Sequence, residues 1–133
     1  MSGFRITYAT MSADDAELQA SYTAASAEVL DQLGATHPLW IGDEERFGPT
    51  FTTVSPVDTS VEIGHFTIGD GDDVDDAVTA ARSAQRGWAA IPWEERCEIL
   101  ERAADLISER SIVDGAALAW ENGKSRLEAI GEV

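Results

Sequence analysis

The chain contains a single cysteine, and a thiol is the side chain here best suited to act as a nucleophile. Catalysis by Cys97 would require a nearby base and surroundings that stabilise the thiolate. The residue instead falls on the apolar stripe of a predicted helix, three residues before Leu100 and seven before Ala104. We therefore expect Cys97 to be a buried core cysteine and not a catalytic residue.

The two histidines do not provide a base or a metal site at an obvious spacing. His37 stands at the entry to a predicted strand, and His65 alternates within another. We expect a structural or surface role for both. One thiol with two distant histidines is not a zinc ligand set, and a single cysteine cannot form an internal disulfide, which indicates a reducing compartment.

Aspartates crowd residues 70–76, a pattern that invites comparison with a calcium-binding loop. The spacing does not fit, because Asp75 would occupy the position that requires glycine and Ala81 the position of the bidentate glutamate. Carboxylates at the start of a helix favour its dipole, so a helix N-terminus on an acidic surface is the better interpretation.

Two glycine-containing strings resemble phosphate-binding loops only weakly. Gly69-x-Gly71 lacks the third glycine of a dinucleotide fingerprint, and residues 122–125 lack the upstream glycine of a P-loop. The tryptophans at positions 40, 88, 93 and 120 are expected to pack at element ends and not to form a ligand cage. The residues present therefore assemble no catalytic, cofactor-binding or metal site.

The charge balance is strongly acidic, with 25 Asp and Glu against 9 Lys and Arg and a net charge of −16. Such a surface disfavours nucleic acids and anionic membranes as partners. It suits either an adaptor that binds basic partners or a halophilic surface, and we favour the latter because the acids are spread over nearly every segment. Residues 1–10 resemble no targeting leader, and no apolar run approaches the roughly 18 residues of a membrane span, so we expect a soluble, cytoplasmic protein.

The elements that would position these residues fall into three regions, 1–36, 37–69 and 70–133. In the first, Ser12 and the acids after it favour the start of an amphipathic helix that Gly34 ends. Its apolar face consists of Leu18, Tyr22, Ala25, Val29 and Leu33. In the second, strand candidates at 39–41, 51–54 and 61–68 with turns at 42–45 and 55–60 predict a small antiparallel sheet.

The third region is helical. One helix begins at the acidic run and carries Val74, Ala77, Val78, Ala81 and Trp88 as its apolar face. A second begins at Pro92 and ends near Arg110, and a third begins after Ser111 and ends at Gly123. Residues 125–128 form a capping box that opens a fourth helix. A helix barely begun is marginal alone, so we expect that the natural chain continued.

Several strings in the third region resemble the first helices of the aldehyde dehydrogenase family, in order and in register. They are Val74-Asp-Asp-Ala-Val78, Gly87-Trp88, Pro92-Trp-Glu-Glu-Arg96, Ile99 to Leu106, and Glu121-Asn-Gly-Lys124. Ser55-Pro56 stands where Asn-Pro is usual in that family. The leading helix followed by His37-Pro-Leu-Trp-Ile-Gly42 is similar to the 1-pyrroline-5-carboxylate dehydrogenase branch, also called L-glutamate γ-semialdehyde dehydrogenase.

The resemblance implies an α/β fold, of which this chain is the N-terminal part of the NAD(P)-binding domain: a leading helix, a small antiparallel sheet and then helices, before the Rossmann core. It implies a full-length homo-oligomer that oxidises a small aldehyde with NAD or NADP, in proline catabolism for the branch named above. The family's Gly-Gln-x-Cys and Glu-Leu-Gly-Gly-Lys strings have no match here. We therefore expect these residues alone to be inactive and to bind no cofactor well; the alternatives are an acidic helical interaction module or a non-functional gene remnant.

Overall fold

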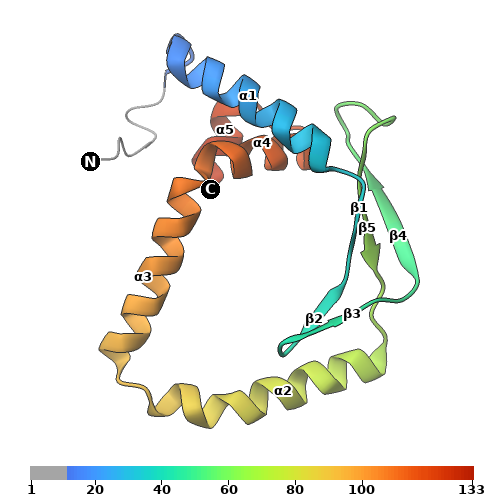
Figure 1. The fold of residues 1–133 in the computed structure, drawn as a ribbon, viewed down its shortest axis with the longest axis vertical. Coiled ribbons are helices and arrows are strands. Elements are labelled where there is room, and N and C mark those ends of the chain that lie inside the picture. Colours follow the sequence, from blue (N-terminus) through green and yellow to red (C-terminus); the bar gives the residue numbers. More distant parts are fainter. Residues whose placement is uncertain (1–11) are drawn as a thin grey trace.

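The computed structural model describes residues 12–133. Residues 1–11, which include the opening segment predicted to be no targeting leader, lie outside them. The chain forms an arc whose two ends meet, because the C-terminal helices α4 and α5 return to the first helix, α1 (Figure 1). Its elements are α1 (Ala16–Gln32), β1 (Ala35–His37), β2 (Leu39–Ile41), β3 (Glu44–Arg46), β4 (Thr50–Val54), β5 (Glu62–Thr67), α2 (Gly71–Ala90), α3 (Trp93–Glu109), α4 (Ser111–Asn122) and α5 (Arg126–Glu132).

Helix α1 begins and ends where local chemistry favours it. The carboxylate of Asp15 accepts hydrogen bonds from the backbone N–H groups of Glu17 and Leu18, at 3.0 and 3.1 Å. Asp15, one of the early acids, is therefore the N-cap, and Ser12 lies outside the helix. Gly34 follows the helix with φ +81°, a left-handed conformation that costs glycine little, which confirms the predicted end.

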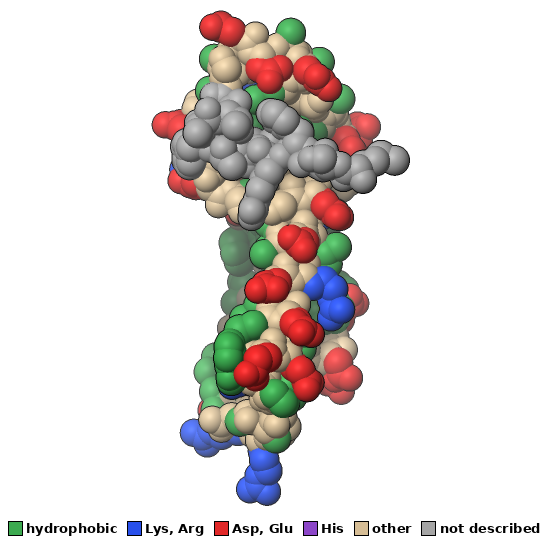
Figure 2. Space-filling view, turned by 90° about the vertical axis from the view of Figure 1, so that its left-hand side faces the viewer, with side chains coloured by type: hydrophobic (Ala, Val, Ile, Leu, Met, Phe, Trp, Pro, Cys, Tyr) green, Lys and Arg blue, Asp and Glu red, His purple; other side chains and the backbone are tan. Residues whose placement is uncertain are grey.

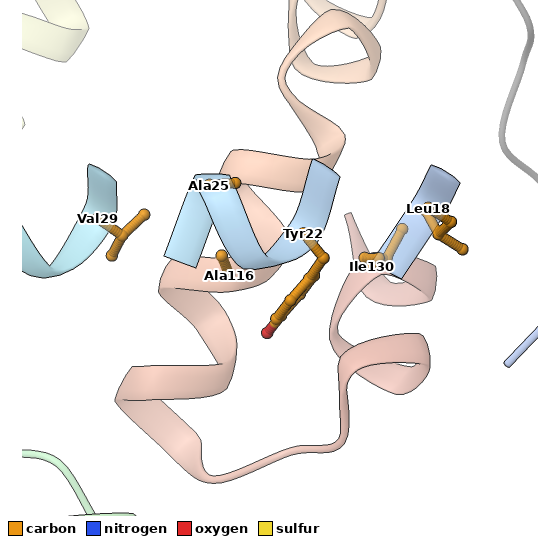
Figure 3. Packing of buried hydrophobic residues seen from close by; sticks show 6 residues of the cluster. All are labelled: Leu18, Tyr22, Ala25, Val29, Ala116 and Ile130. Atoms are coloured by element: carbon orange, nitrogen blue, oxygen red, sulfur yellow. The ribbon is translucent and has the colours of Figure 1, made fainter. Parts of the chain in front are cut away.

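The main core lies where α1 crosses α4 and α5. Four of the five predicted core positions of α1 are buried, and they pack with Ala116 of α4 and Ile130 of α5 (Figure 3). The four are Leu18, Tyr22, Ala25 and Val29, and Leu33 packs at the edge. Burying each large side chain of this group contributes about 1.5–3 kcal/mol relative to leaving it exposed. The core therefore joins residues from the two ends of the described chain.

The strands form two small sheets, and their pairing differs in part from the expectation. β4 pairs with β5 antiparallel, and β2 pairs with β3 in an antiparallel hairpin turned by Gly42 at φ +66°. β1, which was not predicted as a strand, pairs with β5 in parallel, so the predicted antiparallel sheet also contains one parallel pair. β2 was predicted from its apolar residues, whereas β1 (Ala-Thr-His) and β3 (Glu-Glu-Arg) are as short, mostly exposed and without an apolar run, so both were missed.

Helices α2 and α3 form the part of the arc that leads from the strands back to α4 (Figure 1), and their boundaries follow the predicted signals. Asp70 caps α2 and forms a reciprocal capping box with Asp73. Pro92 is the N-cap of α3, one position before the site expected for it, and Arg110 is the C-cap, close to the predicted end. Neither helix contains a buried residue. Within residues 12–133, no helix is long and apolar enough to cross a membrane.

The crossing of α4 and α5 depends on a residue without a side chain. A Cβ added to Gly115 would lie 3.0 Å from both Cα and Cγ1 of Ile130. We predict that Gly115→Ala lowers the free energy of unfolding by about 1–3 kcal/mol, because the helices must move apart. Chemical denaturation followed by circular dichroism measures the change.

The control for this prediction is Gly87→Ala, which adds the same methyl group to α2 where nothing lies within 4 Å. That change should be neutral or stabilising by about 0.5–1 kcal/mol, since alanine restricts the unfolded chain. Equal effects of the two substitutions would contradict the packing argument.

Candidate functional site

Cys97 lies exposed on α3, so the expectation of a buried core cysteine was wrong. The helical spacing was correct, since Cys97 does share a face with Leu100, and Leu100 is itself 63% exposed. The face is apolar but has no partner within the described residues. An amphipathic pattern predicts which face of a helix avoids water, and it does not say whether the covering element is in the same chain.

The histidines lie on the small three-stranded sheet, in neighbouring strands. The ring of His37 stacks on Phe66 with centroids 4.9 Å apart. Nδ1 of His65 is 2.9 Å from Oγ1 of Thr52, and its Nε2 is 3.4 Å from a carboxylate oxygen of Glu62. These contacts are the structural or surface roles that the sequence predicts.

The acidic run forms the start of α2 and also fixes the β2–β3 hairpin to it. Nη1 of Arg46 lies 3.2 Å from Asp73 and 2.8 Å from Asp76. The pKa of Asp73 is lowered, first by the hydrogen bond from the backbone N–H of Asp70 and then by the guanidinium of Arg46. Because its pKa is lower when folded, this carboxylate stabilises the fold above its ordinary titration range and loses that effect as the pH falls. The run therefore has a structural explanation.

The turn that joins α4 to α5 is also structural. Gly123 adopts φ +77°, and the backbone N–H of Lys124 donates to Oδ1 of Asn122 at 3.0 Å. Ser125 and Glu128 form the predicted capping box, and Lys124 pairs with Glu132. The polar groups of residues 122–125 are thus engaged with one another and with α5, and do not form a phosphate cradle.

A buried serine links the sheet to the helical core, a contact that sequence analysis missed. Ser55 has no exposed surface, and its Oγ donates to the carbonyl oxygen of Trp120 at 2.5 Å. That carbonyl lies in the last turn of α4, where carbonyl groups lack helical donors. Nε1 of Trp120 donates in turn to Oγ of Ser26 in α1 at 3.0 Å. The signal in the sequence was only a Ser-Pro turn.

The tryptophans divide between packing and exposure. Trp120 alone among the four packs against the core, whereas Trp40 is 65% and Trp93 64% exposed. The expectation that all four serve as packing residues therefore fails for Trp40, Trp88 and Trp93. Among residues 12–133 there is no cluster of three potential metal ligands. The described residues form a scaffold, and their candidate chemical groups lie apart on different elements.

Comparison with known sequences assigns this scaffold to a family. The sequence model of the aldehyde dehydrogenase family matches residues 40–133, from β2 to the end of α5. The chain belongs to the aldehyde dehydrogenase family.

Relatives within the family include two kinds of semialdehyde dehydrogenase. The 1-pyrroline-5-carboxylate dehydrogenase of Staphylococcus saprophyticus is 33% identical over 113 residues, which cover 84% of this chain and 22% of that protein. The N-succinylglutamate 5-semialdehyde dehydrogenase of Burkholderia cenocepacia is 40% identical over 86 residues, covering 65% of this chain and 18% of that protein. The chain thus spans about a fifth of the length of the curated relatives it matches.

Solved structures agree with the sequence comparison. The 1-pyrroline-5-carboxylate dehydrogenase from Thermus with bound NAD matches with a TM-score of 0.85 and 26% identity, over 90% of this chain and 23% of that one. The Mycobacterium tuberculosis enzyme bound with NAD matches with a TM-score of 0.78 and 30% identity, over 88% and 22%. The predicted fold, an N-terminal portion of the aldehyde dehydrogenase architecture, is confirmed.

The link through Ser55 gives a testable prediction for this family scaffold. Ser55→Ala should lower the free energy of unfolding by about 1–3 kcal/mol, because the buried carbonyl of Trp120 loses its donor. Ser60→Ala in the same loop is the matched control, since Ser60 lies exposed and bonds to Asp58 at the surface. Denaturation followed by tryptophan fluorescence measures both. If Ser60→Ala lowered the free energy of unfolding as much as Ser55→Ala, the role assigned to the Ser55–Trp120 hydrogen bond would be contradicted.

Proposed function

We propose that this chain is the N-terminal part of an NAD(P)-dependent aldehyde dehydrogenase that oxidises L-glutamate γ-semialdehyde, the open form of 1-pyrroline-5-carboxylate, to glutamate. The observation that carries the proposal is the alignment of 113 residues with the Staphylococcus saprophyticus enzyme. Structural likeness to 1-pyrroline-5-carboxylate dehydrogenases over 90% and 88% of the chain supports the same branch.

The N-succinylglutamate 5-semialdehyde dehydrogenases support a second candidate substrate. Their identity is higher, at 40%, but their alignment is shorter, at 86 residues. Both candidate substrates have the five-carbon backbone of glutamate semialdehyde, and one of them carries a succinyl group on the amino nitrogen. The longer alignment favours the unacylated substrate. The residues that would distinguish the two substrates lie outside this chain.

The N-terminus of α2 does not fit the phosphate of a dinucleotide. A cofactor phosphate would need free backbone N–H groups at a helix N-terminus. At α2 the N–H groups of Asp72 and Asp73 are already bound by the carboxylate of Asp70, at 2.9 and 3.1 Å. The acids around them would also repel a phosphate. In the proposed enzyme the start of α2 therefore supports the cofactor domain, and its residues take no part in hydride transfer.

The substrate proposal is tested on the enzyme extended through its downstream coding sequence. We expect it to form NADH or NADPH with 1-pyrroline-5-carboxylate, with kcat/KM exceeding that for propanal by a factor on the order of 100 or more, because a site that binds charged groups discriminates strongly against substrates lacking them. The 133-residue chain alone serves as the inactive control. Preference for propanal, or for the N-succinyl compound, would disprove the assignment.

We further propose that the acidic surface is an adaptation to high salt. Repulsion within a chain of net charge −16 is screened as the Debye length falls to about 3 Å in 1 M salt. The free energy of unfolding should therefore rise between 0.1 and 2 M KCl, measured by denaturation at each concentration. Replacing Glu94, Glu98 and Glu101 by Gln and Asp105 by Asn should flatten this dependence. A stability that is independent of KCl would refute the proposal.

A further inference from the structure

The turn between α4 and α5 contains two adjacent residues that can react with each other. Asn122 is the only asparagine of the chain, and glycine follows it directly. Asparagine is a thermally labile residue, because the backbone nitrogen of the next residue can attack its carboxamide carbon. A glycine in that position leaves the nitrogen unhindered, since it has no side chain. Both residues are exposed, so water has access to the site.

The reaction is a deamidation, and water is its only co-reactant. The nitrogen of Gly123 gives up its proton and bonds to Cγ of Asn122, while the bond from Cγ to Nδ2 breaks and Nδ2 takes up a proton and leaves as ammonia. Water then opens the cyclic imide, adding its hydroxyl to one carbonyl carbon and returning a proton to the nitrogen. Opening at Cγ gives aspartate. Opening at the main-chain carbonyl gives isoaspartate, in which the main chain runs through the former side chain.

The folded turn engages both reacting groups in hydrogen bonds. The N–H group of Gly123 donates to the carbonyl oxygen of Ala119 at 2.9 Å, so the electron pair left by its proton would point at Ala119 and not at Cγ. Oδ1 of Asn122 accepts from the backbone N–H of Lys124 at 3.0 Å, which fixes the carboxamide. Removing the proton breaks the first bond, and turning the carboxamide breaks the second. The closed turn therefore opposes the reaction at both of its partners.

We propose that Asn122 is a site of spontaneous deamidation, blocked while α5 is docked on the core and reactive when α5 separates from it. Two residues of α5, Ala129 and Ile130, are buried, and they hold the helix in place. The turn is short, so movement of α5 disturbs the bonds at Gly123 and Asn122. Because deamidation is irreversible, the modified fraction records how much time the chain has spent with α5 undocked.

The isoaspartate product would prevent α5 from docking again. It places an additional main-chain atom between α4 and Gly123 and so shifts α5 relative to α4. The contact between these helices has no spare room, since a Cβ on Gly115 would lie 3.0 Å from Cα of Ile130. The modification therefore converts a reversible opening into a lasting one.

The charge of the chain slows the reaction in every conformation. Loss of the proton from Gly123 creates a further negative charge in a chain of net charge −16, and Glu121 directly precedes the reacting pair. Figure 2 shows acidic side chains spread along the visible face of the molecule. Salt screens this effect, so folded and unfolded chains must be compared at one ionic strength. Urea, which is uncharged, is therefore the denaturant for the test.

The test incubates the 133-residue chain in mildly alkaline buffer, with and without urea. Peptide mass spectrometry follows the gain of about 1 Da that accompanies replacement of NH2 by OH. We expect the gain at Asn122, and a rate in buffer slower than in urea by a factor on the order of ten or more, because only the open fraction reacts. Isomerisation at Asp70-Gly71 or Asp114-Gly115 does not interfere, since it leaves the mass unchanged.

Two variants outside the reacting pair test whether α5 controls the rate. Gly115→Ala forces α4 and α5 apart and should accelerate deamidation in buffer by about fivefold or more, because the open fraction rises. Gly87→Ala adds the same methyl group to α2, where nothing lies within 4 Å, and should leave the rate unchanged or slower. In urea both variants should react at the rate of the wild type, since the sequence around Asn122 is the same.

Several results would overturn the proposal. Equal rates in buffer and in urea would show that the folded turn gives no protection. Equal rates for Gly115→Ala and Gly87→Ala in buffer would show that docking of α5 does not control the reaction. A mass gain confined to glutamine residues, or none at Asn122 in urea, would remove the site itself. The assay requires no substrate or cofactor, so its outcome is independent of the proposed dehydrogenase activity.

Discussion

The packing of α1 against α4 and α5 is the constraint on which the rest of the structure depends. It brings Tyr22 and Ile130 together although they lie near opposite ends of the described chain. All the intervening elements must then form a closed path, and the arc in Figure 1 is that path. The guanidinium of Arg126 in α5 lies 5.0 Å from the ring centroid of Tyr22 and donates a hydrogen bond to Gln19. These polar contacts at the edge of the core also join α5 to α1.

This constraint explains why the strands pair as they do. Because α1 is held on α4, the chain that leaves α1 at Gly34 enters β1 alongside β5, with Ala35 opposite Gly64. Gly64 permits this approach, since a Cβ there would lie 3.0 Å from the ring of His37. The buried Ser55 then ties the far end of β4 to Trp120. The small sheet is thus oriented by the helical core, since three short strands provide little stability of their own.

Local signals predicted the helices well, because each boundary depends on residues adjacent in sequence. Asp70, Gly123 and the Ser125–Glu128 box act within a few positions of the elements they begin or end. The parallel pairing of β1 and the bond from Ser55 to Trp120 depend on residues far apart in the chain, and short strings contain no signal for them. The exposure of Cys97 was mispredicted for a related reason, since periodicity reports the apolarity of a face and not the presence of its partner.

The described residues identify the family without assembling a catalytic site, because they form scaffold elements. The residues that match the family contain helix caps, a turn at Gly123 and apolar helix faces, all of which specify scaffold geometry. Such features must be retained wherever the geometry is retained, whatever the substrate. A catalytic group, by contrast, functions only with its neighbours. His37 here stacks on Phe66, His65 bonds to Thr52 in the neighbouring strand, and Cys97 lies exposed on α3. A scaffold can therefore identify an enzyme family even though its own side chains take no part in the reaction and only position other residues.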